Sequence, residues 1–299
     1  MKHLDFFKRC LILFLVFIFS DFLISIVLIN GLNKFYGFSK KPEILFNGSS
    51  MTMSGFNRKD IESITGKQIA TYAQEGVSVI DRNAMIIHFF QMYPDGVKTV
   101  VYEVNPLLFS QVRTAKNVYT NFYPYMDDKI IDRYIKENAV TEEYYTNKFI
   151  RTKRFESRLI RLILMGYLGK YDNLKTNTLD TASLLPLKKQ KVKTEVIMDQ
   201  SSIDVFERTM ELISTHNSNI VLVMMPMYYI KLQSFSSNGY GNLIRYLNDY
   251  SSVKKNIKFL NLNQDSIVYN PGYFSDQLHF NVYGQNKITN IISSYLIER

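Results

Sequence analysis

Three residues in two distant parts of the chain are of the types that together activate a hydroxyl for attack on an acyl group. Ser50 follows a short apolar run and a glycine, whereas Asp276 and His279 stand three positions apart late in the sequence. A serine hydroxyl is a weak nucleophile until a neighbouring base takes its proton. An imidazole suits that task near neutral pH, and a carboxylate can orient it and stabilise the imidazolium that forms. These residues therefore predict a nucleophile, an orienting carboxylate and a base.

Acyl transfer also requires hydrogen-bond donors for the oxyanion of the tetrahedral intermediate. We expect the backbone amide of Ser50 to be one donor, Gly76 to offer a second, and the side-chain amide of Asn105 to offer a third. Two of these have simpler alternatives. Gly76 suits an ordinary turn, and Asn105 precedes Pro106 and suits the end of a strand.

The segments around these residues alternate between two patterns. Five have the composition of buried strands: Glu43–Asn47, Gln68–Ala73, Thr99–Tyr102, Ile220–Met225 and Ile257–Leu262. Helical patterns lie between and after them: Arg58–Thr65, Ser78–Met92, Ser202–Thr215, Leu243–Tyr250 and Val282–Leu296. Such alternation predicts an α/β fold, a flavodoxin-like doubly wound parallel sheet of about five strands. Its sites form at the carboxyl ends of strands, where both Ser50 and the Asp276/His279 pair are expected.

Residues 1–33 form a separate region. Cys10–Asn33 contains one charged residue, Asp21, and its 24 residues would extend about 36 Å as a helix, enough to cross a hydrocarbon core of roughly 30 Å. The apolar stretch is long for a cleavable signal peptide and has no obvious small-residue cleavage site, which favours an uncleaved transmembrane anchor. Basic residues are nearly balanced on its two sides. We expect the N-terminus in the cytosol and the domain 34–299 translocated across the membrane.

Two features leave alternatives open. Asp21 falls near the middle of the expected span, where it is either a tolerated protonated or snorkelling side chain or a contact with a membrane partner. A helical insertion with a linker is expected at 106–198, and its segment Phe149–Tyr171 carries basic residues among apolar positions at helical spacing. That segment is either an amphipathic helix on anionic lipid or a partner, or an ordinary helix that packs its apolar face on the core.

Composition excludes several classes of function. The net charge of +9 is not accompanied by a nucleic-acid-binding motif, so we expect no nucleic-acid partner. The single cysteine, Cys10, excludes a disulfide framework and zinc sites built from cysteines. No motif predicts a metal ion or a cofactor.

The motifs together resemble the SGNH (GDSL-type) hydrolase superfamily. The resemblance rests on a strand followed by Gly-x-Ser at Ser50, on Gly76, on Asn105 and on the block DQLHFNVYG that begins at Asp276 and contains His279. It covers roughly residues 43–105 and 199–299, and it is most specific in the last block. The resemblance implies a flavodoxin-like fold, Ser50 as nucleophile, His279 as base, Asp276 as its partner, and oxyanion donors at Ser50, Gly76 and Asn105.

The chain departs from the family pattern at two places. Ser49 stands where the family has an aspartate before the catalytic serine, and Glu103-Val104-Asn105-Pro106 replaces its Gly-x-Asn-Asp block. More narrowly, the chain resembles membrane-anchored members that act on cell-envelope polysaccharides, often beside a membrane-bound O-acyltransferase.

The resemblance thus implies a membrane-anchored enzyme that transfers or removes an O-acyl group, most simply acetyl, on an envelope polysaccharide. Its implied partners are that polysaccharide, membrane lipid and a membrane-bound O-acyltransferase. The alternative keeps the fold without the chemistry: a catalytically inactive glycan-binding or scaffold protein in a membrane acylation complex.

Overall fold

The computed structural model describes residues 2–110, 118–171, 173, 175–189 and 192–298. The chain forms two compact units. We name them the helical unit (Met1–Ser39 and Asn117–Lys170) and the sheet unit (Lys40–Lys116 and Tyr171–Arg299). The expected insertion at 106–198 is therefore divided: its middle belongs to the helical unit, and its last part, from Tyr171, belongs to the sheet unit.

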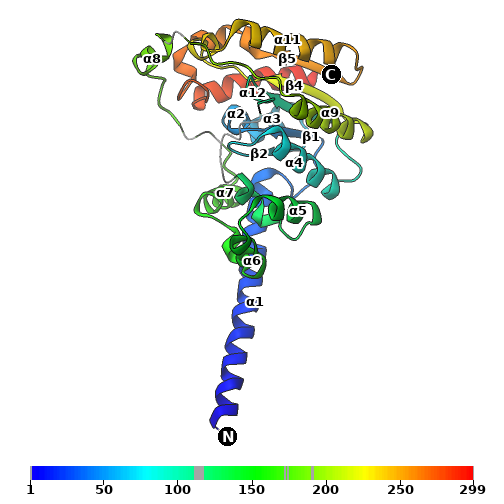
Figure 1. The fold of residues 1–299 in the computed structure, drawn as a ribbon, viewed down its shortest axis with the longest axis vertical. Coiled ribbons are helices and arrows are strands. Elements are labelled where there is room, and N and C mark those ends of the chain that lie inside the picture. Colours follow the sequence, from blue (N-terminus) through cyan, green and yellow to red (C-terminus); the bar gives the residue numbers. More distant parts are fainter. Residues whose placement is uncertain (1, 111–117, 172, 174, 190–191, 299) are drawn as a thin grey trace. The chain divides into compact units, whose positions relative to one another are not determined.

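A parallel sheet of five strands forms the centre of the sheet unit (Figure 1). Its strands are β1 (Ile44–Gly48), β2 (Ile69–Ala73), β3 (Thr99–Val104), β4 (Asn219–Met224) and β5 (Ile257–Asn261). Their order across the sheet is β2-β1-β3-β4-β5, and every neighbouring pair is parallel. This is the flavodoxin-like order, in which the direction of winding reverses between β1 and β3. The predicted fold class is confirmed.

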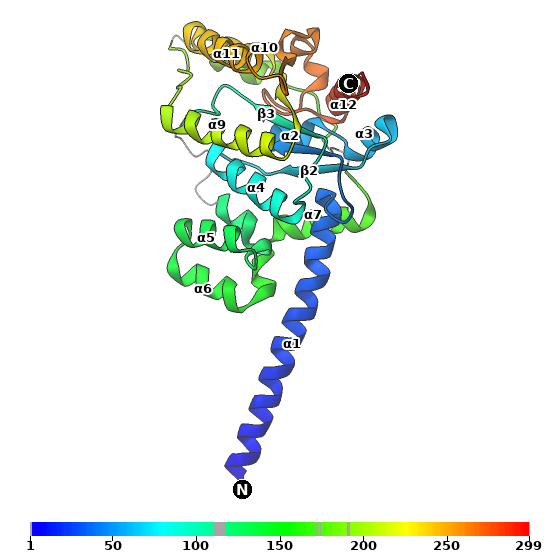
Figure 2. The same cartoon turned by 90° about the vertical axis from the view of Figure 1, so that its right-hand side faces the viewer.

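Helices cover both faces of the sheet (Figure 2). The longer ones are α3 (Arg58–Thr65), α4 (Val79–Met92), α9 (Gln200–Thr215), α11 (Ser237–Ser252) and α12 (Val282–Ile297). α4 packs beside α9 on one face, and α3 packs beside α12 on the other, which is the arrangement that right-handed crossovers require. Shorter helices and 3₁₀ turns lie in the connections: α2 (Ser50–Gly55), η3 (Thr181–Leu184), α8 (Leu185–Lys188), α10 (Tyr229–Gln233), η4 (Leu262–Gln264), η5 (Ser266–Tyr269) and η6 (Pro271–Tyr273).

The helix boundaries follow from capping residues in the sequence. The Asn57 side chain accepts hydrogen bonds from the first amides of α3, and Gly66 ends that helix in a left-handed conformation with φ 70°. Ser78 and Asp81 form a reciprocal capping box at the start of α4. These caps fix where each helix leaves the sheet, and so place the loops at the carboxyl ends of the strands.

The helical unit is built around one long helix. It contains α1 (Lys2–Tyr36), η1 (Val118–Tyr125), α5 (Lys129–Asn138), α6 (Thr141–Phe149), η2 (Arg151–Arg154) and α7 (Ser157–Leu168). By its length and composition, α1 can cross a membrane. α7 packs closely on α1, since a Cβ on Gly166 would lie 2.7 Å from the amide nitrogen of Phe35. The Tyr167 hydroxyl also donates to the carbonyl of Val27 at 2.6 Å.

The single helix expected over Phe149–Tyr171 is wrong. The chain leaves helical geometry at Ile150 and again at Phe155, where both backbones are extended, so α6, η2 and α7 are separate elements. The apolar face of α7 packs on α1, which agrees with an ordinary packed helix except that its partner is the long apolar helix and not the sheet core.

Asp21 also has a partner within its own chain. Its carboxylate accepts hydrogen bonds from the backbone amides of Arg151 at 2.7 Å and Thr152 at 2.9 Å, and from the Thr152 hydroxyl. Asp21 therefore caps η2 of its own chain. This contact differs from both alternatives that the sequence left open, a tolerated side chain within the membrane and a contact with a membrane partner.

Candidate active site

Ser50 lies on a tight turn between β1 and α2. Ser49 caps the helix: its backbone is extended (φ −97°, ψ −162°) and its hydroxyl accepts a hydrogen bond from the amide of Met51. Ser50 is the first residue of α2, where helix amides lack carbonyl partners and carry a partial positive charge. Within the described part of the chain, no acceptor bonds the Ser50 amide. This N–H is therefore free to bind an oxyanion formed beside the Ser50 hydroxyl.

The structure brings Ser50, His279 and Asp276 into one hydrogen-bonded line. The Ser50 Oγ lies 2.8 Å from the His279 Nε2. The other ring nitrogen, Nδ1, lies 3.0 and 2.9 Å from the two carboxylate oxygens of Asp276. An ionised carboxylate can only accept, so Nδ1 carries the proton and donates it, and Nε2 is left to accept the proton of the Ser50 hydroxyl. This is the geometry of a serine nucleophile with its base and orienting group.

The Asp276 carboxylate is held in its ionised form. Partial burial raises its pKa, but hydrogen bonds from the His279 ring and from the backbone amides of Leu278 and His279 outweigh burial and lower the pKa to about 2. Lys175 Nζ lies 3.9 Å from the same carboxylate. Asp276 is therefore a permanent anion beside the imidazole at any physiological pH.

The loop that carries Asp276 and His279 is closed on itself. The Ser275 amide donates to the carbonyl of His279 at 2.8 Å, and Phe274 and Phe280 form an antiparallel bridge on either side of the site residues. Asn281, fully buried, caps α12 and donates to the carbonyl of Gly272 at 2.8 Å. These bonds fix the backbone that carries the His279 imidazole.

Asn173 joins the two halves of the site. Its side-chain amide donates to the carbonyl of Ser54 in α2 at 3.2 Å and to the carbonyl of Phe280 in the late loop at 2.6 Å. Its backbone amide donates to Gln285 in α12 at 2.8 Å. Sequence reasoning does not identify this role, because Asn173 lies in a stretch that is predicted to be a linker.

A buried carboxylate accepts hydrogen bonds from the residues around Ser50. Glu103, at the end of β3 and 1% exposed, accepts hydrogen bonds from the Ser49 amide at 2.7 Å and the Ser49 hydroxyl at 2.8 Å. It also accepts from the amide and hydroxyl of Thr52 at 3.2 and 2.7 Å. Glu103 thus bonds to residues on both sides of Ser50. The two departures from the family pattern, at positions 49 and 103, are in direct contact.

Arg82 neutralises this carboxylate. It is fully buried in α4, its guanidinium lies 3.2 Å from Glu103, and it also donates to the Glu103 backbone carbonyl. Burial raises the pKa of Glu103, but the Arg82 charge and the bonds from Thr52, Asn105 and Ser49 outweigh it and hold the pKa below its ordinary value. The sequence analysis missed this pair; the available signal was an arginine at helical spacing with the apolar residues Val79 and Ile86 of α4.

The two remaining oxyanion candidates lie at strand ends but differ in their surroundings. Gly76 follows β2 in a turn with φ 71°, a conformation that glycine adopts without strain. Asn105 donates from its side-chain amide to Glu103 at 3.0 Å and accepts from the Leu107 amide at 2.9 Å. One of the two N–H groups of that amide is therefore directed at Glu103, which leaves the other for an oxyanion.

Comparisons with known proteins give only a distant similarity. No family model matches the sequence, and no curated protein matches it. The chain is similar to the crystal structure of a Bacteroides fragilis protein provisionally described as an acylhydrolase, with 12% identity over 87% of this chain and 90% of the other and a TM-score of 0.44. It is also similar to a Streptococcus pneumoniae structure provisionally described as a platelet activating factor, with 12% identity over 97% and 99% of the two chains and a TM-score of 0.40. What the site does is therefore inferred from its own atoms.

Two further histidines, His88 and His216, have structural contacts. The Nδ1 of His88 lies 3.0 Å from the Tyr72 hydroxyl inside the sheet unit, and His216 stacks on Phe90 with ring centroids 4.0 Å apart. Among the residues that the structure describes, no three histidine, cysteine, aspartate or glutamate side chains are arranged to hold a metal ion.

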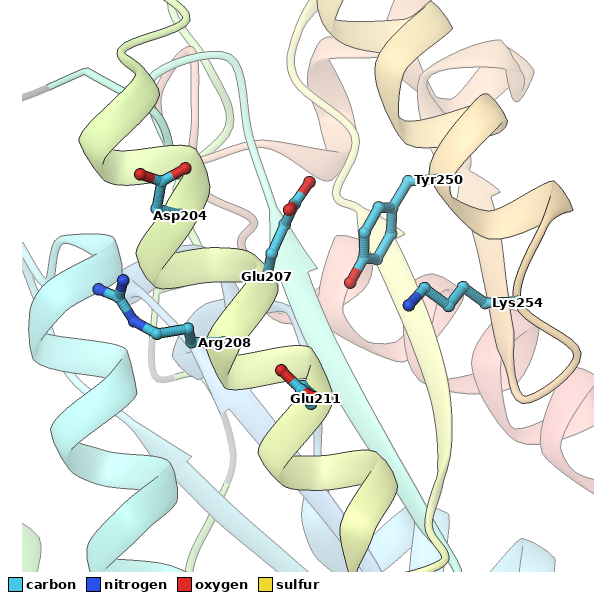
Figure 3. A pocket seen from close by; sticks show the side chains of 6 residues that line it. All are labelled: Asp204, Glu207, Arg208, Glu211, Tyr250 and Lys254. Atoms are coloured by element: carbon cyan, nitrogen blue, oxygen red, sulfur yellow. The ribbon is translucent and has the colours of Figure 1, made fainter.

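A separate hollow of about 320 Å³ lies between α9 and α11 (Figure 3). It is lined by Asp204, Glu207, Arg208, Glu211, Tyr250 and Lys254. Glu207 is already bonded to the Tyr246 hydroxyl at 2.8 Å, and burial raises the pKa of Tyr250 to about 12. This hollow contains neither a nucleophile with a base nor any of the residues at the strand ends. We therefore place the candidate chemistry at Ser50.

Proposed function

We propose that the protein is a membrane-anchored serine enzyme that removes or transfers an O-acyl group, acetyl in the simplest case, on a cell-envelope polysaccharide. The observation that carries the proposal is the 2.8 Å approach of the Ser50 Oγ to the His279 Nε2, with Asp276 bonded to the far side of the same ring. A hydroxyl in this position can pass its proton to a base as it attacks a carbonyl carbon.

The reaction follows from these positions. The Ser50 oxygen bonds to the acyl carbon, its proton moves to His279, and the carbonyl oxygen becomes an oxyanion held by the Ser50 amide, with Gly76 and Asn105 as further donors. The intermediate collapses as His279 returns the proton to the departing alcohol oxygen. This leaves an acyl ester on Ser50. Attack by water regenerates the serine in an esterase, whereas attack by a glycan hydroxyl does so in a transferase.

A fluorophosphonate probe tests the serine chemistry directly. We expect the full-length protein to be labelled and the Ser50→Ala variant to remain unlabelled. Ser54→Ala is the matched control, because Ser54 lies one turn further along α2 and its hydroxyl donates to the carbonyl of Met51 within the same helix. Labelling that persists in Ser50→Ala would remove the proposed nucleophile.

Transfer and hydrolysis are separated by the fate of the acyl group. The protein would be incubated with an activated acetyl ester and an oligosaccharide acceptor. The amounts of acetate and acetylated glycan formed would then be measured. Acetate as the only product excludes transfer and leaves the esterase. We propose transfer, because an anchored domain can receive its acyl group from a membrane-bound O-acyltransferase.

The non-catalytic scaffold was suggested by the altered residues at positions 49 and 103. Those residues are bonded to each other at 2.7 and 2.8 Å, so the alteration keeps the serine turn supported. This support favours the enzyme over the scaffold. Glycan binding without turnover, unchanged in His279→Ala, would favour the scaffold instead.

For the anchor, we propose that α1 spans the membrane and that the sheet unit lies outside the cytosol. The chain has one cysteine, Cys10, which simplifies the test. In a Cys10→Ser background, a Tyr269→Cys variant would be treated with a membrane-impermeant maleimide. Tyr269 is 67% exposed in the sheet unit. Labelling in intact cells supports the proposed topology. Labelling only after lysis would place the sheet unit in the cytosol instead.

A further inference from the structure

Aromatic rings form a continuous series from the loop that carries Asp276 and His279 to the surface of the sheet unit. Each ring centroid lies between 4.9 and 5.8 Å from the next one. The rings belong, in this order, to Phe280, Phe274, Tyr228, Tyr229 and Tyr269. The first three side chains are buried, Tyr229 is partly buried, and Tyr269 is 67% exposed. The series therefore connects the candidate site to an exposed aromatic pair.

The backbone also holds this pair next to the site. The amide of Tyr228, the residue before Tyr229, donates to the carbonyl of Gln277 at 3.1 Å, and Gln277 lies between the two site residues of the late loop. Tyr269 is the last residue of η5, a turn that the Asp265 side chain caps by accepting a hydrogen bond at 2.9 Å. The two rings therefore have a fixed position relative to the loop that carries the base.

Polar groups at the edges of the pair are open to a ligand. Within the described part of the chain, neither the Tyr229 hydroxyl nor the Tyr269 hydroxyl makes a hydrogen bond. Asn270 follows Tyr269 directly and is exposed. Its side-chain oxygen accepts from the Gly272 amide at 2.9 Å, so its two side-chain N–H groups remain available as donors. The pair thus combines an exposed ring with donors and acceptors around it.

A pyranose ring has the complementary chemistry. Its C–H groups form an apolar face that packs on an aromatic ring, and its hydroxyls lie around the rim, where they bond to polar groups. A lipid or an apolar protein segment would need a broader apolar surface, yet Tyr269 is the only large apolar side chain exposed within residues 262–280. Tyrosine also offers its contact area with few rotatable bonds, so that little conformational entropy is lost when a ligand binds.

We infer that Tyr229, Tyr269 and the side-chain amide of Asn270 form a subsite that binds a pyranose ring of the glycan, beside the sugar whose acyl group reaches Ser50. The inference deepens the proposed function and rests on it for the position of the acylated sugar. The subsite makes the sugar chain, in addition to the acyl group, a feature that the protein recognises. An oligosaccharide of several rings is therefore bound more tightly than a short one.

The dependence of binding on chain length tests the subsite. Binding would be measured by calorimetry with the full-length Ser50→Ala variant, which cannot remove the acyl group from its ligand. The ligands are partly O-acetylated chitobiose and chitohexaose, and partly O-acetylated cellobiose and cellohexaose. We expect a hexasaccharide to bind about ten-fold more tightly than its disaccharide, an effect of the size that one aromatic contact produces at a binding site.

Variants of Tyr269 in the same background assign the effect to the subsite. Tyr269→Ala should weaken hexasaccharide binding about ten-fold and so remove the preference for the longer chain. Tyr269→Phe keeps the ring and should retain that preference. The matched control is Tyr145→Ala, which removes a tyrosine that is 50% exposed and stacks on Phe149 in the helical unit. This control should leave both dissociation constants unchanged.

The outcomes separate the subsite from the serine chemistry, because binding requires no turnover. If the fluorophosphonate probe labels Ser50 but binding shows no dependence on chain length, or one that Tyr269→Ala retains, the subsite is overturned and the enzyme remains. If the dependence is lost in Tyr269→Ala but Ser50 is never labelled, the enzyme is overturned and the glycan subsite remains. Binding of none of the ligands contradicts the subsite.

Discussion

The carboxylate of Glu103 accepts a hydrogen bond from the backbone amide of Ser49 at 2.7 Å, immediately before the residue that faces the imidazole. In the SGNH pattern that the chain resembles, an aspartate occupies position 49. Here the acidic group belongs to Glu103 on the neighbouring strand β3, and it accepts hydrogen bonds from the residue at position 49. The charge thus remains next to the serine turn although its position in the sequence has changed.

Replacing Glu103 with glutamine should lower the free energy of unfolding of the sheet unit. The variant leaves the buried Arg82 without a counter-charge, which typically costs about 3–5 kcal/mol of unfolding free energy. The folded pKa of Glu103 lies below its ordinary value of 4.5. Its stabilisation is therefore complete above about pH 4.5 and is lost as the pH falls through the folded pKa. We expect the stability gap between wild type and Glu103→Gln, measured by denaturant unfolding, to narrow on acidification.

Glu211→Gln serves as the control for this change. Glu211 is exposed on α9, so its neutralisation should alter the unfolding free energy by no more than about 0.5 kcal/mol. A Glu103→Gln variant as stable as this control, or a gap that widens at low pH, would contradict the role assigned to the buried pair.

Asp276→Asn should reduce kcat about 10²–10⁴-fold, because the amide can present the wrong group to Nδ1 and allow the wrong tautomer of His279. The pKa of Asp276 is lowered from 3.8 to about 2. The contribution of the ionised carboxylate is therefore complete above about pH 3.8, and it is lost only as the pH falls through about 2. Any loss of activity nearer neutral pH therefore comes from another group. Esterase kinetics and an NMR titration of the carboxyl carbon check the two statements. Asp249→Asn, on the exposed side of α11, is expected to keep full activity.

Much of the fold could be predicted from the sequence because its signals are local. Alternating strand and helix patterns predicted the five parallel strands, and short motifs at strand ends predicted that Ser50, Asp276 and His279 would approach one another. Both inferences need only that parallel strands end at one edge of the sheet.

The supporting contacts could not be predicted, because each depends on a residue far away in the chain. Glu103 and Arg82 lie on different elements, and the sequence around each of them does not indicate which residue it contacts. The sequence predicts for Asp21 either a tolerated protonated or snorkelling side chain or a contact with a membrane partner, yet its carboxylate accepts a hydrogen bond from Arg151 of its own chain. Such pairs depend on packing between elements, which composition and periodicity do not encode.

Gly48→Ala should disturb the nucleophile more than the fold. A Cβ at position 48 would lie 2.6 Å from the Glu103 carboxylate and would also meet the Thr52 hydroxyl, so the turn that carries Ser50 must shift. A displacement of about 1 Å at a reacting group can cost about 100-fold in rate. We expect kcat/KM for an acetyl ester to fall by that order. Gly241→Ala is the matched control, since its Cβ meets nothing within 4 Å in α11 and should raise stability by about 0.5–1 kcal/mol. Equal activity in the two variants would show that the turn tolerates a side chain at position 48.

Asn173→Ala should separate the nucleophile from its base. The variant removes the amide that bonds to the carbonyls of Ser54 and Phe280, and so releases α2 from the loop that carries His279. Loss of these bonds should lower the unfolding free energy by about 1–3 kcal/mol and slow the fluorophosphonate reaction of Ser50 about 10–100-fold. Asn173→Asp should be equally slow, because an ionised carboxylate cannot donate to either carbonyl. Asn248→Ala removes a side-chain bond within α11 only, and should react at the wild-type rate. If Asn173→Ala loses stability but keeps the wild-type labelling rate, the residue stabilises the fold without positioning the site.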